Sequence, residues 1–171
     1  VHGTDNKSAA EQGDIVIITV PFSSHSAILQ EISSAVVGKI VADATVPLMP
    51  PKVATVQLPT TGSAAFVTQE ALGGRADVVA AFHNVAADKL RNLGPIDCDV
   101  LVCGNKKSAR QTVIKLVNGL GMRGLHAGPI ENSAAAEALT SVIITINRLY
   151  KVDGAGIRIT GDFTAPDTDS A

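Results

Sequence analysis

The sequence predicts an α/β domain with a mostly parallel sheet that is covered by helices on both faces. Apolar residues make up 46% of the 171 residues and aromatic residues only 3%. Ala, Val, Ile and Leu therefore supply the core, a mix that suits close packing of helices on a sheet. The first β-branched run, residues 14–20, is apolar on both faces, as a parallel sheet buried between helices requires.

The first strand-helix-strand unit is built around this run. A helical turn over residues 6–12 precedes it, and Pro21 ends the strand. A helix is expected over residues 25–36, and Gly38 stops it before a second strand at residues 39–43. The unit spans about 30 residues, the length that a crossover between parallel strands needs.

The alternation of strands and helices resumes after a long, proline-rich loop at residues 44–61. The expected elements are a helix capped by Gly62 and Ser63 and ending near Leu72, a strand at 77–82, a short helix at 86–93, a strand at 99–103, a helix at 107–118, a short strand at 125–127, the longest helix at 132–150 and a strand at 156–160. Residues 1–160 are expected to form a single domain, and residues 161–171 a polar tail.

The composition argues against several classes of function. The formal net charge of -2 leaves no broad basic face, so no nucleic-acid partner is expected. No uninterrupted stretch of about 18 apolar residues occurs, so no membrane span is expected. Two cysteines without a signal peptide at the start favour a reducing compartment and a cytoplasmic location. The basic residues around one helix are interpreted as a solvated face without a ligand; they are Lys106, Lys107, Arg110 and Lys115.

An N-terminal part of the sheet is expected to be missing. The run from Ile15 to Val20 needs neighbouring strands on both edges and helices on both faces, yet little precedes it, and the chain does not begin with Met. No Gly-x-Gly-x-x-Gly sequence follows a strand, and no Walker sequence is present. If the domain binds a dinucleotide, the pyrophosphate cradle is expected outside this chain.

Three consecutive strand ends carry the candidate site. They are Thr19 to Phe22, Thr45 to Pro47, and His83 to Ala87. Ligands of open α/β sheets bind beyond the carboxyl ends of the strands, so these exits could line one cleft. The alternative is that they are three ordinary strand-to-loop connections.

His83 is the strongest single candidate because it follows an apolar strand and is expected to point into that cleft, as a hydrogen-bond donor or a packing ring. A structural role is the alternative, and the case for His25 is weaker. Cys98 and Cys103 are interpreted as small core residues, since their spacing suits neither a zinc knuckle nor a redox pair. No cluster has metal-ligand spacing, and no Gly-x-Ser-x-Gly sequence supports a hydrolase.

An ordered series of short motifs runs along most of the chain. It comprises residues 14–21, Gly38 to Val41 with Val46 and Pro47, Gly62 to Ala65, Ala81 to His83 with Asn92 and Leu93, Val102 to Gly104, Ala127 to Pro129 with Asn132 and Ser133, and Gly156 with Ile157. In order and spacing this series resembles the family of NADPH-dependent reductases of the deazaflavin coenzyme F420. The resemblance covers residues 3–159 and implies a Rossmann-like dinucleotide-binding domain that lacks its first βαβ part.

The resemblance also implies cofactors and contacts. These enzymes pass a hydride between reduced coenzyme F420, an 8-hydroxy-5-deazaflavin, and NADP. The residues matched to NADP contacts are Val20, Pro21, Val46 and Ala87, and those matched to the deazaflavin are His83, Asn84, Val85, Ala155, Gly156 and Ile157. No side chain is expected to act as a general acid or base, because the cofactors supply the reactivity and the protein aligns them. A homodimer is expected, since family members commonly associate in pairs.

Two other functions remain open. The chain could reduce a different acceptor with NADPH, such as a flavin, a ferric complex, or a small imine or keto acid, since a shared fold does not fix function. It could also be a binding module without catalytic activity.

Overall fold

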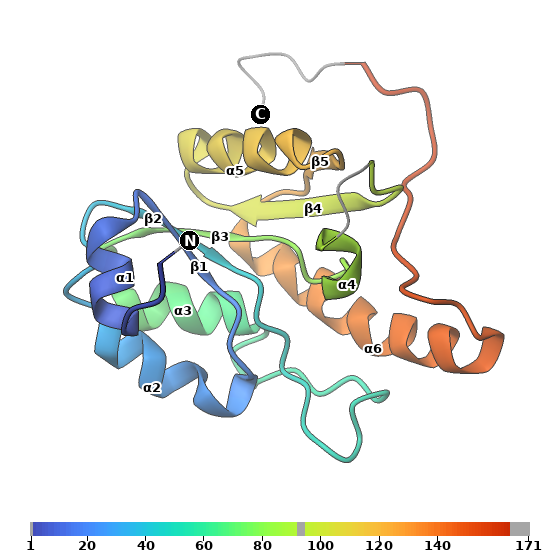
Figure 1. Ribbon diagram of the computed structural model, residues 1–171, viewed down its shortest axis with the longest axis horizontal. Coiled ribbons are helices and arrows are strands. Elements are labelled where there is room, and N and C mark those ends of the chain that lie inside the picture. Colours follow the sequence, from blue (N-terminus) through green and yellow to red (C-terminus); the bar gives the residue numbers. More distant parts are fainter. Residues whose placement is uncertain (1, 92–94, 165–171) are drawn as a thin grey trace.

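A five-stranded sheet forms the centre of the computed structural model, which describes residues 2–91 and 95–164 (Figure 1). The strands lie in the order β1 to β5; they are β1 (Ile15–Ile18), β2 (Ile40–Asp43), β3 (Asp77–Ala80), β4 (Asp99–Gly104) and β5 (Arg123–His126). All neighbouring pairs are parallel except β3 and β4, which are antiparallel. The expected mostly parallel sheet is therefore confirmed.

Helices cover both faces of the sheet. They are α1 (Asn6–Gln12), α2 (Phe22–Ile32), α3 (Ala64–Leu72), α4 (Ala87–Leu90), α5 (Lys107–Gly119) and α6 (Ser133–Tyr150), with a 3-10 turn at Ile130–Asn132. In Figure 1, α1, α2 and α3 lie on one side of the sheet and α5 lies on the other. The longest helix, α6, ends at the residue that the apolar periodicity predicts.

Side-chain alternation in β3 separates two apolar clusters. Val78 points to the cluster that contains Leu72 of α3, whereas Val79 points to the cluster that contains Val113 and Val117 of α5. Successive side chains of a strand face opposite sides, so a run of apolar residues can contribute to both clusters. This explains why the residues of β3 that follow Asp77 are all apolar.

Several element boundaries differ from the expectation. Helix α2 begins directly after Pro21 and ends four residues earlier than expected, and α4 is a single turn. Residues 92–94 of the expected short helix and residues 165–171 of the expected tail lie outside the described residues. Residues 156–160 form no strand, which corrects the expected last strand. They run beside β4, but the Asp99 carboxylate accepts the amide of Ile159, so a side chain takes the place of a ladder partner.

Strand β1 differs most from its expected environment. Within the described residues it pairs only with β2, and Ile17 is 43% exposed. Helix α5 packs against β3, β4 and β5, so it does not cover this end of the sheet. The expectation of a strand buried on both faces is wrong for Ile17 in this structure.

The basic helix face also needs a correction. Arg110 is buried, and its Nη1 donates to the carbonyl oxygen of Gly104 at 2.6 Å. Lys106 pairs with Asp77 at 2.7 Å, and Lys115 is exposed. Arg110 therefore holds the end of β4 on α5, and the expected solvated face does not include it.

Candidate functional site

The ends of β1 and β2 enclose the first candidate cavity. Because the two strands are parallel, their carboxyl ends meet at the same edge of the sheet. The cavity there has a volume of about 570 Å³ and contains Val20, Pro21 and Val46, the predicted NADP contacts of these two exits. The proline-rich loop closes it with Leu48, Met49, Pro50 and Val53. We call this space the β1–β2 cavity.

A second cavity lies where β3 ends and β4 begins. These strands are antiparallel, so the exit of one and the entry of the other share an edge. The space has a volume of about 460 Å³; its walls are Asn84 to Ala86 with Lys89, Pro95 to Cys98, and Gly154 to Gly156. We call it the β3–α4 cavity. It brings together Asn84 and Val85 with Ala155 and Gly156, some 70 positions later in the sequence, all four of which the resemblance matched to the deazaflavin.

The three strand exits therefore do not line one cavity, which corrects that expectation. The cause is the turn after β3. Phe82 adopts a left-handed conformation with φ of 69°, rare for a residue with a side chain, and its carbonyl oxygen accepts the amide of Val85 at 3.2 Å. The chain turns away from the β1–β2 cavity at this point. Two other predicted contacts, Ala87 and Ile157, line neither cavity.

The segment that follows α6 is held in place by hydrogen bonds on both sides of the β3–α4 cavity. The amide of Ala155 donates to Asn147 Oδ1 at 3.0 Å, and the carbonyl oxygen of Ile157 accepts the amide of Asp99 at 2.8 Å. Arg123 pairs with Asp99, and this hydrogen bond is the main reason that the pKa of Asp99 is lowered. The segment is thus a fixed wall although it forms no strand.

Gly156 is required for the close approach of this wall to β4. A Cβ atom at Gly156 would lie 2.6 Å from Cys98 Sγ and 3.0 Å from Cys98 Cβ. We expect Gly156→Ala to lower the free energy of unfolding by roughly 1–3 kcal/mol, because overpacking forces the wall outward. Urea unfolding measures the change. Gly119→Ala is the matched control, since a Cβ there meets nothing within 4 Å; equal stability of both variants would contradict the close contact.

The ring of His83 lies in the interior, which corrects the expectation that it points into a cleft. Its side chain is 1% exposed, and Nε2 lies 3.8 Å from Glu137 Oε1, too far for a hydrogen bond. Burial lowers the pKa of His83 to about 4, against the opposing charge of Asp43. The ring is therefore neutral at neutral pH and forms no ion pair with Glu137. Within the described residues, neither ring nitrogen has a hydrogen-bond partner.

Glu137 of α6 ties that helix to the start of α3. Its Oε2 accepts the amide of Ala64 at 2.7 Å and its Oε1 accepts the amide of Ala65 at 3.1 Å. A carboxylate at a helix N-terminus satisfies amides that have no partner within the helix. Burial raises the pKa of Glu137 to about 7, while the two hydrogen bonds act in the opposite direction. This buried acid was not singled out in the sequence, although it interrupts a run of alanines.

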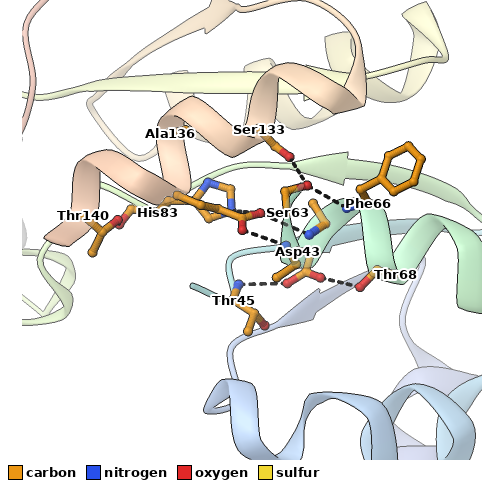
Figure 2. A network of polar contacts seen from close by, with 12 residues as sticks. Asp43, Thr45, Ser63, Phe66, Thr68, His83, Ser133, Ala136 and Thr140 are labelled. Carbon is orange, nitrogen blue, oxygen red and sulfur yellow. Dashed lines mark hydrogen bonds and ion pairs between the residues drawn. The ribbon is translucent and has the colours of Figure 1, made fainter. Parts of the chain in front are cut away.

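Other polar contacts extend the link between α6 and the rest of the site (Figure 2). Ser133 donates to Ser63 Oγ at 2.7 Å, and Ser63 caps α3 as the sequence predicts, accepting the amide of Phe66. Farther along α6, Thr140 Oγ1 donates to the carbonyl oxygen of His83 at 3.0 Å. The side chain of Asn84 donates to the carbonyl oxygen of Ala136 at 2.9 Å. Helix α6 therefore fixes the turn that forms one wall of the β3–α4 cavity.

Asp43, the last residue of β2, is the centre of a second buried network. Its Oδ1 accepts the amide of Thr45 at 2.8 Å, and its Oδ2 accepts from Thr68 (Figure 2). The same Oδ2 also accepts from His25 Nε2 at 2.9 Å. Burial alone would raise the pKa of Asp43, but His25, Thr68 and Thr45 together outweigh it and leave the pKa lowered. The carboxylate is therefore ionised at neutral pH and fixes the turn into the β1–β2 cavity. His25 has a structural role here.

The two cysteines behave as small core residues, as the sequence predicts. Both are free and buried. Burial raises the pKa of both thiols, that of Cys103 to about 11, so they are protonated at neutral pH. Within residues 2–91 and 95–164, no group of three or more His, Cys, Asp or Glu side chains is arranged to hold a metal ion. None of the helices in that part of the chain is long and apolar enough to cross a membrane.

A mostly parallel sheet between two helical layers, with cavities beyond its strand ends, defines a domain of the Rossmann type. Ligands of this class bind outside the carboxyl ends of the strands. The sequence profile described as "NADP oxidoreductase coenzyme F420-dependent" matches residues 1–47. The F420-dependent NADP reductase of Methanocaldococcus jannaschii is 39% identical over 163 residues, which are 92% of this chain and 73% of the relative.

Two further comparisons agree. The F420-dependent NADP reductase of Methanothermobacter marburgensis is 35% identical over 94% of this chain and 74% of the relative. The crystal structure of a candidate F420-dependent NADP reductase from Arthrobacter sp. FB24 has a TM-score of 0.82 and 24% identity over 92% of this chain and 74% of that chain, which shows the fold. The chain belongs to the F420-dependent NADP reductase family.

Proposed function

We propose that this protein is an NADP-dependent oxidoreductase that transfers a hydride between reduced coenzyme F420 and NADP. The observation that carries the proposal is the division of the candidate contacts between two cavities. The residues matched to NADP gather mainly in the β1–β2 cavity, and those matched to the deazaflavin gather mainly in the β3–α4 cavity. The names of the relatives support the same pair of cofactors.

On this proposal the β1–β2 cavity holds part of NADP. Its volume of about 570 Å³ lies within the range of small-molecule sites, about 300–1,000 Å³. Val20, Pro21 and Val46 would exclude water and offer backbone groups, and Ala87 would contact the same cofactor from the start of α4. The buried Asp43 network would keep the β2 exit rigid while the cofactor binds.

The β3–α4 cavity fits a flat ring on the same reasoning. Val85, Ala86, Ala155 and Gly156 present small side chains or none, so a planar group can lie close to the backbone. The Asn84 amide nitrogen is already engaged with α6, which leaves its backbone to face the ligand. His83 directly precedes Asn84 and would support its position, and Ile157 would hold the opposite wall through its bond to Asp99.

Few reactive side chains are needed for this reaction. Hydride passes directly between the two rings, so the cofactors supply the chemistry and the protein supplies alignment. Reacting carbons must be held about 3–3.5 Å apart. The small and apolar residues of both cavities would let the rings lie close to the backbone and would keep water out. We therefore assign no general acid or base.

A fluorescence titration of coenzyme F420 into the protein, with and without NADP, tests the proposal. We expect saturable binding of the deazaflavin and, when NADPH replaces NADP, loss of NADPH absorbance coupled to deazaflavin reduction. Binding of NADP together with reduction of a flavin or a ferric complex, but not of the deazaflavin, would favour a reductase of another acceptor. Binding of neither cofactor would favour a module without this activity.

Replacing His83 by Ala is expected to weaken binding of the deazaflavin about tenfold while NADP affinity changes little. The reason is that the ring is buried beside Glu137, directly before the residues Asn84 to Ala86 that line the cavity. Deleting such a side chain leaves a void into which the wall can relax. Separate KM values for the two cofactors measure the effect. His126→Ala, on the exposed end of β5, is the control. Unchanged deazaflavin kinetics in His83→Ala would show that His83 does not support the cavity wall.

We also propose a homodimer, a cytoplasmic location and a single domain over residues 1–160. The dimer is supported by an exposed apolar stripe on α6, where Val142, Ile146 and Leu149 are 45%, 38% and 66% exposed. The location is supported by two cysteines that remain free. Sedimentation of the purified protein measures the assembly state.

A further inference from the structure

One cationic side chain stands at the β3–α4 cavity. Lys89, in the single turn of α4, is the only lysine or arginine among the described residues that line this space. Its side chain is half-buried. The other lining residues are neutral except Asp97. A lysine in this position can meet a ligand inside the cavity without losing all contact with water.

The position of Lys89 is set by its aliphatic stem. A Cβ atom placed on Gly154 would lie 3.1 Å from Lys89 Cε and 3.5 Å from Lys89 Cγ, and 2.9 Å from Ala86 Cβ. The stem therefore lies along the backbone of the opposite wall, where glycine leaves room for it. Packing of a lysine stem on a protein surface directs its ammonium group and limits its rotamers.

The acidic groups near Lys89 are engaged elsewhere. Asp97 pairs with Arg158 at 2.5 Å. Asp88, the neighbour of Lys89 in α4, pairs with Arg91 at 3.1 Å, and both of those side chains are about 80% exposed. Within the described residues no ion pair joins Lys89 to a carboxylate. The cavity therefore offers a positive charge to whatever enters it.

We propose that Lys89 is a specificity-determining residue that binds an anionic oxygen of the deazaflavin coenzyme. This inference rests on the proposed function. The oxygen belongs either to the ring, whose hydroxyl can ionise, or to an acidic group of the side chain attached to the ring. A charge-assisted hydrogen bond in a partly dehydrated cavity is stronger than an exposed ion pair. Lys89 selects for an anionic deazaflavin over a neutral ring of the same shape.

The test is the dissociation constant of coenzyme F420, measured by fluorescence titration for the wild type, Lys89→Met and Lys89→Arg. We expect about tenfold weaker binding in Lys89→Met, which keeps the stem and removes the charge, as the loss of one charged hydrogen bond implies. Lys89→Arg restores most of the affinity. NADP affinity stays the same in all three proteins. The salt dependence of F420 binding becomes weaker in Lys89→Met, because screening acts on the lost charge.

A second ligand separates the two sources of the oxygen. A tenfold loss with the bare 8-hydroxy-5-deazaflavin ring as well as with the full coenzyme assigns the ring oxygen, whereas a loss with the full coenzyme alone assigns the side chain. Equal affinity of wild type and Lys89→Met for both ligands overturns the inference. Lys115→Met, on the exposed face of α5, controls for net charge. If the wild type binds no deazaflavin, the proposed function fails and this inference fails with it.

Discussion

Replacing Glu137 by Ala is expected to lower the free energy of unfolding by about 4 kcal/mol. The substitution leaves the amides of Ala64 and Ala65 buried without an acceptor, and each unsatisfied group costs about 1–3 kcal/mol. It also removes the link between α6 and α3 next to the ring of His83. Urea unfolding at neutral pH measures the loss.

Two variants control this result. Glu131→Ala removes an exposed carboxylate from the turn just before α6 and should change the stability by less than about 0.5 kcal/mol. Glu137→Gln keeps the shape and one acceptor oxygen, so it should lose much less than Glu137→Ala. A Glu137→Ala protein as stable as the wild type would mean that the two amides find other partners.

The raised pKa of Glu137 gives the wild type a distinctive pH dependence. With a pKa of about 7 in the folded protein and 4.5 as the ordinary value, the folded state holds more protons than the unfolded state between these limits. The stabilisation is fully present below about pH 4.5 and is lost as the pH rises to about 7, by about 3 kcal/mol. The difference in stability between wild type and Glu137→Gln, measured from pH 4 to pH 8, should fall over that window. His83, whose pKa is lowered, acts in the opposite direction in both proteins and cancels in the difference.

Replacing Asp43 by Ala is the second change with a large expected effect, about 3–5 kcal/mol of stability. Asp43 is fully buried and ionised, and it accepts from His25, Thr68 and the amide of Thr45. Removing it leaves the buried amide of Thr45 without an acceptor, and it leaves Thr68 Oγ1 and His25 Nε2, which lie 2.9 Å apart, with only each other as partners. The turn that carries Val46 into the β1–β2 cavity also loses its anchor, so NADP should bind several-fold more weakly.

Thermal and urea unfolding measure the stability, and a titration with NADP measures the second effect. Asp153→Ala, at an exposed position after α6, is the matched control and should behave like the wild type. Asp43→Asn keeps an acceptor for Thr45 and should retain more NADP affinity than Asp43→Ala. If Asp43→Ala lost stability but bound NADP as tightly as the wild type, Asp43 would stabilise the fold without contributing to NADP binding.

Much of the fold was predictable because its signals are local. The β-branched residues around Val16 and Val78 and the cap at Ser63 act within a few residues of one another. The expected strand at residues 156–160 was wrong because its pairing depends on Asp99, some 60 positions away, whose carboxylate replaces a ladder bond. The alternation pattern of a short apolar run cannot reveal that a distant carboxylate will accept one of its backbone amides.

The candidate site was predictable as a set of segments but not as a geometry. The resemblance named Val20, Val46, Asn84 and Gly156 as contacts, but it did not indicate that these residues line two separate cavities. The antiparallel placement of β4 beside β3 and the left-handed Phe82 created the second one. The burial of Glu137 and the place of Lys89 at a cavity were missed, because an acid in an alanine run and one lysine of a short helix look like ordinary surface residues.

By itself, the sequence determined the fold class, the order of most elements and the family, since these depend on composition, periodicity and ordered short motifs. Only the tertiary structure decided which residues meet: that His83 faces the interior, that Asp43 and Glu137 are buried hubs, and that Lys89 stands at a cavity. The physical reason is that burial and charge are properties of neighbours brought from distant positions. Dehydration of Glu137 and His83 shifts their pKa values in opposite directions, and no local pattern carries that information.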